Sequence, residues 1–167
     1  MAARSLYLVR HAIAANRGDK WPDDSQRPLT HEGKARMREG VRGLDALGPD
    51  IDIVATSPLV RAGQTADLLV RGLTPRPELV TIAALAPGSP PARVVEALAA
   101  HAPAKAMAVV GHEPDLGELA AWLIGAHQPL PLKKGGMCRI DFPDWPPARQ
   151  QGTLIWLAIP KMLRSLD

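Results

Sequence analysis

The sequence predicts an α/β protein: one domain of three layers, in which helices cover both faces of a mostly parallel sheet. Three observations support this. The chain has 167 residues, enough for one well-buried core and short of the usual size of two domains. Short apolar segments with β-branched residues alternate with longer amphipathic segments, as in successive strand–helix–strand units. Pro and Gly number 17 and 14, below the share typical of disordered chains. Residues 1–167 are therefore expected to form a single domain.

The alternating elements occupy the first three quarters of the chain. Strands are predicted at residues 5–11, 51–57, 79–83 and 106–111, where apolar runs end in charged, polar or proline residues. Helices are predicted at residues 30–47, 59–72, 91–101 and 114–125. The first helix has Thr30 or His31 near its N-cap, and Gly48 and Pro49 close it. Connections of this length favour right-handed crossovers between parallel strands.

The last part of the chain has a different pattern. Two further strands are predicted at residues 136–142 and 153–159, and a Pro-rich loop joins them. A short connection between strands is typical of a hairpin, whose strands are antiparallel. We therefore expect a mostly parallel sheet with an antiparallel C-terminal strand.

Composition excludes several classes of function. The net charge of +3 is spread along the chain and aromatic residues make up 4%, too few for a base-stacking surface, so no nucleic acid is expected as a partner. No apolar run approaches the roughly 18 residues of a membrane span, and Arg10 and His11 interrupt the apolar start where a signal peptide would need its core. The single cysteine excludes an internal disulfide, and no Cys/His cluster has zinc-ligand spacing. We expect a cytoplasmic protein with no metal, no cofactor and no membrane association.

Histidine and arginine residues follow three of the predicted strands. Arg10 and His11 end the first strand, Arg61 begins the helix after the second, and His112 follows the fourth. Ligands of open α/β sheets bind outside the carboxyl ends of the strands. A neutral imidazole can attack phosphorus, and guanidinium groups stabilise the charge of a phosphoryl group in transfer. Each residue alone would more often be structural, but the four at one edge predict a phosphoryl-transfer site.

Because Arg10 and His11 are adjacent in the sequence, the path of the backbone decides whether both side chains can reach one site. Successive side chains of a strand point to opposite faces of the sheet. The chain must therefore leave the sheet at this point if both side chains are to reach one phosphate. The small side chain of Ala12 permits such a turn.

The motifs at these strand ends resemble those of a known family. Leu8-Val9-Arg10-His11-Ala12, Ser57-Pro58-Leu59-Val60-Arg61-Ala62-Gly63-Gln64-Thr65 and Val110-Gly111-His112 resemble the two arginine motifs and the second histidine of the histidine phosphatase superfamily, which has the phosphoglycerate-mutase-like fold. The short chain and three further motifs are similar to the SixA-type protein phosphohistidine phosphatases. These motifs are Arg27-Pro28-Leu29-Thr30-x-x-Gly33, Leu85-Ala86-Pro87-Gly88 and Gly111-His112-Glu113-Pro114-Asp115-Leu116.

The resemblance implies a role for each site residue. His11 would be the nucleophile that forms a phosphohistidine intermediate, and Arg10, Arg61 and His112 would hold the phosphoryl group. Arg27 would close over the phosphate; the alternative is that it anchors the turn at Pro28. The implied ligand of the pocket is phosphate or another oxyanion, and the implied mechanism uses no metal and no cofactor.

The sequence departs from the family pattern in three places. Ala12 stands where the family has Gly. Residues 81–93 contain no carboxylate, whereas the mutases and monoester phosphatases of the superfamily supply a Glu or Asp there as general acid. An alkoxide needs that proton to leave, whereas phosphohistidine releases a neutral imidazole once solvent or His112 protonates it. The segment that elsewhere roofs the pocket is also short. The missing carboxylate and the short roof favour phosphohistidine on a partner protein, such as a histidine phosphotransfer domain, as the substrate.

Two other functions stay open at this point. One is a small-molecule phosphomonoesterase of the same superfamily, and the other is a phosphate-binding module without turnover, which would gain nothing from a nucleophilic histidine.

Three other residues have structural interpretations. Ser57 is a candidate N-cap for the helix that carries Arg61, Glu113 suits the N-terminus of the following helix, and Cys138 is expected to be a buried apolar residue.

Overall fold

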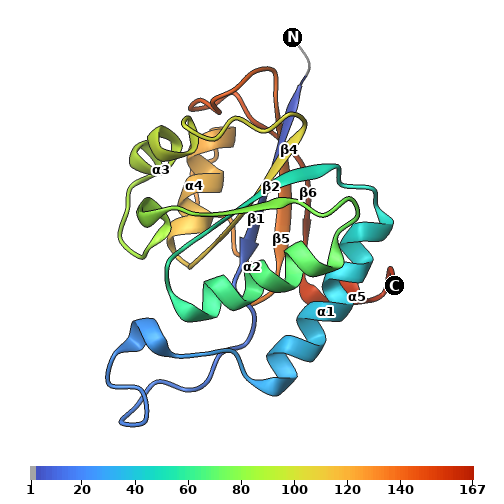
Figure 1. The fold of residues 1–167 in the computed structure, drawn as a ribbon. Helices are drawn as coiled ribbons and strands as arrows, with labels where there is room; N and C mark the ends of the chain where they lie inside the picture. Colours follow the sequence, from blue (N-terminus) through green and yellow to red (C-terminus); the bar gives the residue numbers. More distant parts are fainter. Residues whose placement is uncertain (1–2) are drawn as a thin grey trace.

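A computed structural model describes residues 3–167 and contains one six-stranded sheet (Figure 1). The strands are β1 (Arg4–Arg10), β2 (Ile51–Thr56), β3 (Glu78–Thr81), β4 (Ala106–Gly111), β5 (Met137–Phe142) and β6 (Thr153–Ala158). Their order in the sheet is β3-β2-β4-β1-β5-β6. The first four strands are parallel, and β5 is antiparallel to both β1 and β6. The predicted mostly parallel sheet is confirmed, and its antiparallel member is the first strand of the C-terminal hairpin.

Helices cover both faces of the sheet. They are α1 (His31–Ala46), α2 (Val60–Gly72), α3 (Pro91–Leu98), α4 (Asp115–Ile124) and α5 (Pro160–Arg164), with short 3-10 turns η1 (Asp24–Gln26) and η2 (Ala83–Leu85). In Figure 1, α1, α2 and α5 lie on one face of the sheet and α3 and α4 on the other. This arrangement confirms the predicted three layers.

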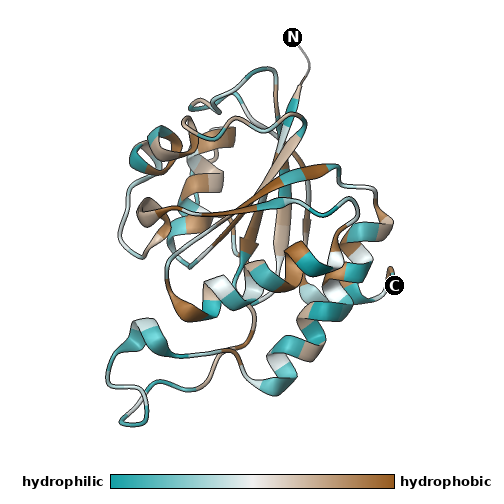
Figure 2. Cartoon of the chain, in the orientation of Figure 1, coloured by the Kyte–Doolittle hydropathy of each residue, from teal (hydrophilic) through white to brown (hydrophobic). Residues whose placement is uncertain are grey.

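The sheet divides the core into two halves, and successive side chains of a strand point alternately into one half and the other. On β1, Tyr7 and Val9 pack in the half beneath α1 and α2, whereas Leu6 and Leu8 pack in the half beneath α3 and α4. All six residues of β4, the strand between β1 and β2, are buried. Figure 2 shows the strands as largely hydrophobic and the outward surfaces of α1 and α2 as hydrophilic. A parallel sheet covered on both faces needs such continuous apolar strands.

The helices differ from the prediction in two places. The helix predicted at 91–101 ends at Leu98, because the His101 N–H donates to the Leu98 carbonyl in a tighter turn. The helix α5 was not predicted. It begins with Pro160, whose fixed φ suits the first turn of a helix, and it packs on α1 where Gly43 lets the Leu163 carbonyl approach closely. Five residues are too few for a helical pattern to be detected in the sequence.

Candidate active site

The carboxyl ends of three neighbouring strands form the floor of the site. In the sheet, β4 lies between β1 and β2. The His11 N–H donates to the Gly111 carbonyl over 3.1 Å, and the Ser57 N–H donates to the Val110 carbonyl over 3.0 Å. These backbone bonds continue the sheet pairing just beyond the strand ends. They therefore fix the segments after β1, β2 and β4 side by side.

The five predicted site residues line one pocket at this edge. The pocket has a volume of about 480 Å³, and its lining includes Arg10, His11, Arg27, Arg61 and His112. All except Arg10 are buried, with exposed fractions of 3 to 7%. The structure thus brings together the five side chains that the sequence analysis placed in the site.

His11 is held as a neutral imidazole with one ring nitrogen free to react. The strand β1 ends at Arg10, so His11 lies just outside the sheet and both side chains reach the pocket, as predicted. His11 Nδ1 lies 2.8 Å from the Ala12 carbonyl, which can only accept, so Nδ1 carries the proton. Burial, with help from the nearby arginines, lowers the pKa of His11 to about 4. At neutral pH, Nε2 therefore presents a lone pair.

The backbone that carries His11 is tied to the helix that carries Arg61. The Ala12 N–H donates to Thr65 Oγ1 over 3.1 Å, and the Thr65 hydroxyl donates to the Arg61 carbonyl over 2.8 Å. Thr65 is fully buried. The turn that follows β1 and the first turn of α2 are therefore positioned as one unit.

His112 faces His11 and is oriented by Ser57. The two imidazole centroids are 5.3 Å apart, and His112 Nε2 lies 2.7 Å from Ser57 Oγ. Ser57 Oγ also accepts the Leu59 N–H, and its own hydroxyl proton can be donated to Nε2, in which case His112 carries its proton on Nδ1. Burial and the neighbouring His11 lower the pKa of His112 to about 3. Ser57 is not the N-cap of α2, because that position belongs to Leu59.

An aspartate that the sequence analysis missed joins two of the arginines. Arg27 Nε lies 3.0 Å from Asp24 Oδ1, and Arg61 Nη2 lies 3.0 Å from Asp24 Oδ2. Arg61 Nη1 also donates to the Asp24 carbonyl, and Arg17 approaches the same carboxylate at 3.7 Å. The hydrogen bond from Arg27, together with the charges of Arg27 and Arg61, lowers the pKa of Asp24. The only signal in the sequence is the Asp-x-x-Arg spacing within a loop that has no periodic pattern.

Several buried N–H groups of the site have no partner in the protein. Arg10 Nη1 donates to the Leu132 carbonyl over 2.9 Å, but Arg10 Nε is unpaired. Within residues 3–167 there are four buried side-chain polar atoms without a partner, and three belong to the site: Arg10 Nε, Arg61 Nε and His112 Nδ1. Buried donors are nearly always satisfied in folded proteins. Unpaired donors on three residues that line one pocket therefore indicate a binding site for an anion.

Glu113 has the structural contact that was predicted for it. Its Oε1 accepts the Gly117 N–H over 2.7 Å at the start of α4. Burial raises the pKa of this carboxyl, and Glu113 also lines the pocket. Cys138 is buried on β5.

The described part of the chain has no group of three or more His, Cys, Asp or Glu residues that could hold a metal ion. The cationic side chains that line the pocket are those of four arginines and Lys134. No helix among residues 3–167 is long and apolar enough to span a membrane.

Comparisons with known proteins agree with this geometry. The family model of the histidine phosphatase superfamily (branch 1) matches residues 6–85. An uncharacterized protein of Picosynechococcus sp. is 41% identical over 140 residues, which cover 79% of this chain and 81% of that protein. A solved structure of the protein histidine phosphatase SixA, complexed with tungstate, superposes with a TM-score of 0.81 at 25% identity and covers 95% of this chain and 99% of its own.

Two more distant structures share the fold. A protein of Nakamurella multipartitia assigned as a phosphohistidine phosphatase SixA has a TM-score of 0.75 at 22% identity, covering 96% of this chain and 98% of its own. Phosphoglycerate mutase of Plasmodium falciparum has a TM-score of 0.63 at 15% identity, covering 95% of this chain and 90% of its own. The expected phosphoglycerate-mutase-like fold is confirmed. The chain therefore belongs to the histidine phosphatase superfamily and is of the SixA type.

Proposed function

We propose that this protein is a phosphatase that works without a metal, through a phosphohistidine intermediate on His11, and that its substrate is phosphohistidine on a partner protein. One observation carries the proposal. Unpaired N–H groups of Arg10, Arg61 and His112 belong to the pocket that also holds a neutral His11 with a free Nε2. This combination suits attack on a bound phosphoryl group.

The first step transfers the phosphoryl group to the protein. The His11 Nε2 lone pair forms the bond to phosphorus while the bond from phosphorus to the leaving nitrogen breaks. Arg10, Arg61 and the Nδ1–H of His112 donate to the nonbridging oxygens, whose charge is redistributed in the transition state. In the second step water attacks phosphorus, the bond to Nε2 breaks, and inorganic phosphate leaves with His11 neutral again.

The acid–base properties of the pocket favour a nitrogen leaving group. The segment after β3 brings Pro87 to the pocket and no carboxylate lies between residues 81 and 93. Asp24 pairs with two arginines and its lowered pKa keeps it ionised, so it is a poor proton donor at neutral pH. Glu113 is the other carboxyl group of the pocket, and its Oε1 is committed to the start of α4, where it accepts the Gly117 N–H. Phosphohistidine needs little help, because solvent protonates the leaving imidazole, whereas an alkoxide requires a positioned acid.

The shape of the pocket supports a protein substrate. Exposed side chains form much of its rim, among them Asn16, Arg17, Pro87 and Lys134. The short connection between β3 and α3 leaves the pocket accessible to a side chain that projects from another protein. A SixA structure that shares 25% identity with this chain is complexed with tungstate, which adds support for an oxyanion ligand.

The test is a comparison of leaving groups. The kcat/KM for a histidine phosphotransfer domain phosphorylated on histidine should exceed that for an alkyl phosphate by about the 10²–10⁴-fold that a general acid is worth. His11→Ala is the matched control and should lose both activities. Hydrolysis of 3-phosphoglycerate or a sugar phosphate at about 10⁵ M⁻¹s⁻¹, with no action on phosphohistidine, would contradict the proposal.

A further inference from the structure

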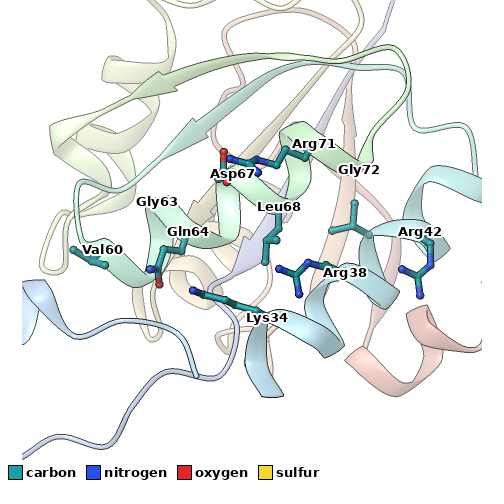
Figure 3. Close-up of a pocket in the computed structure, with 11 residues that line it drawn as sticks. Lys34, Arg38, Arg42, Val60, Gly63, Gln64, Asp67, Leu68, Arg71 and Gly72 are labelled. Atoms are coloured by element: carbon teal, nitrogen blue, oxygen red, sulfur yellow. Dashed lines mark ion pairs between the residues drawn. The ribbon is translucent and has the colours of Figure 1, made fainter. Parts of the chain in front are cut away.

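A second, larger groove lies beside the candidate active site, between α1 and α2. It has a volume of about 730 Å³ (Figure 3). Lys34, Arg38 and Arg42 line it from α1, and Asp67 and Arg71 line it from α2. The groove is therefore rich in positive charge, and it is separate from the pocket that contains His11.

The charges on α1 form a regular row. Lys34, Arg38 and Arg42 are spaced four residues apart, so they lie on one helix face at intervals of about 6 Å. Arg42 pairs with Asp167 over 2.7 Å, and Arg71 pairs with Asp67 over 2.9 Å. Lys34 and Arg38 form no ion pair with any residue in the range 3–167. Two cations in the row are thus available to a partner.

Apart from Gln64, the remaining lining of the groove is apolar, and it lacks aromatic rings. Val41, Val60 and Leu68 contribute aliphatic side chains, and a Cβ added at Gly63 would meet nothing within 4 Å. A nucleic acid would gain no stacking here, since no aromatic residue lines the groove. Aliphatic side chains between cations suit a peptide segment that carries both carboxylates and apolar residues.

The groove begins where the active-site pocket ends. Val60 lines the groove, and the next residue, Arg61, lines the pocket. Gln64, one turn further along α2, accepts the Leu29 N–H over 2.8 Å and so connects the groove to the loop that carries Arg27. A protein whose phosphohistidine enters the pocket would have adjacent surface over this end of the groove.

We infer that the groove between α1 and α2 docks an acidic, amphipathic segment of the phosphoprotein substrate. The identity of the partner as substrate rests on the proposed function, whereas binding of an acidic segment does not. Charge complementarity of this kind acts mainly on the rate of encounter and on specificity, and it weakens with salt. The row on α1 matches carboxylates four residues apart on a partner helix, which repeat at the same interval.

Binding can be measured without turnover. The probe is a fluorescein-labelled helical peptide with Glu at every fourth position and Leu on the adjoining face, and its control has Gln in place of Glu. Fluorescence anisotropy at low salt should show binding of the Glu peptide, weakening as salt is added. Lys34→Glu combined with Arg38→Glu should weaken binding at least tenfold. Arg93→Glu, an exposed residue of α3 on the opposite face of the sheet, should change binding less than twofold.

Any of three results of the binding assay would overturn the inference: equal binding of the Gln peptide, unchanged binding by the double variant, or tighter binding of single-stranded RNA than of the Glu peptide. Thermal melts of each variant exclude unfolding as the cause of lost binding. Self-association of the wild type that disappears in the double variant would assign the groove to a second copy of this chain and would also overturn it.

A kinetic measurement separates docking from catalysis. The double variant should raise KM for the phosphorylated phosphotransfer domain at least tenfold at low salt and leave kcat/KM for p-nitrophenyl phosphate unchanged. An equal loss with both substrates would place the two residues in the catalytic site and contradict a docking role. If the wild type does not act on phosphohistidine at all, the proposed function fails while the peptide result stands. If it does act but binds no acidic peptide, only the groove inference fails.

Discussion

The neutral state of His11 and His112 makes the stability of the protein depend on pH between 7 and 5. Burial lowers the pKa of the two residues from 6.5 to about 4 and about 3. At a pH between these values and 6.5, the two histidines bind protons in the unfolded chain but not in the folded protein. The free energy of unfolding should therefore fall as the pH falls through 6.5, and it should continue to fall until the folded imidazoles become protonated near pH 4.

The size of the effect follows from the same values. Between pH 7 and pH 5, a group with an unfolded pKa of 6.5 that stays neutral in the folded state costs about 2 kcal/mol. Neither imidazole is protonated in the folded protein at pH 5, so repulsion between two charged imidazoles adds nothing to this loss of unfolding free energy. The two together cost about 4 kcal/mol, a large part of the roughly 5–15 kcal/mol that stabilises an ordinary domain.

Urea unfolding at pH 7 and at pH 5 measures this loss, in buffers of constant ionic strength that contain no oxyanion. Each single variant, His11→Gln and His112→Gln, should show a loss about 2 kcal/mol smaller than that of the wild type, because one titrating group is gone. All other groups are common to the proteins compared and cancel. Variants with the full wild-type pH dependence would refute the conclusion that these histidines are buried in the neutral form.

Four further predictions follow from contacts in and near the site. Arg61→Ala should lower turnover by about 10²–10³-fold, as loss of one preorganised donor does elsewhere; normal activity in the folded variant would assign Arg61 a structural role. Asp24→Asn should bind tungstate more tightly in calorimetry, because the carboxylate that competes for the arginines is gone, yet it should turn over more slowly; weaker tungstate binding would contradict this. Turnover should be unchanged by EDTA, whereas loss that one added divalent ion restores would overturn the metal-free mechanism. Gly33→Ala should cost about 1–3 kcal/mol in chemical denaturation, because its Cβ would collide with the Ile13 carbonyl, whereas Gly63→Ala, with open space, should be neutral or stabilising.

The sequence predicted the elements whose patterns are local. The helix at 30–47 has a capping threonine, and Thr30 Oγ1 accepts the Gly33 N–H over 2.9 Å as that pattern requires. The site could be predicted because the carboxyl ends of parallel strands meet at one edge of the sheet. This brings Arg10, His11 and His112 together without any knowledge of the loops.

Contacts between loops and distant elements could not be predicted. Asp24 reaches Arg61 from a segment 37 residues away in the chain, and nothing in the pattern of residues 12–30 fixes the path of that segment. Ser57 has the sequence signature of an N-cap, but its hydroxyl is buried against His112, 55 residues further along. Both residues make polar contacts with residues distant in the chain, and no local pattern in the sequence indicates those contacts.

The most direct test of the account is to trap the phosphorylated protein. Rapid quenching during turnover of a radiolabelled substrate should give label on His11 that is stable to base and labile to acid, as a bond from phosphorus to nitrogen is. His11→Ala should give no label and no turnover. Tungstate should compete with the substrate for binding to the wild type. Label that is stable to acid, or full activity of His11→Ala, would contradict the assignment of His11 Nε2 as the nucleophile.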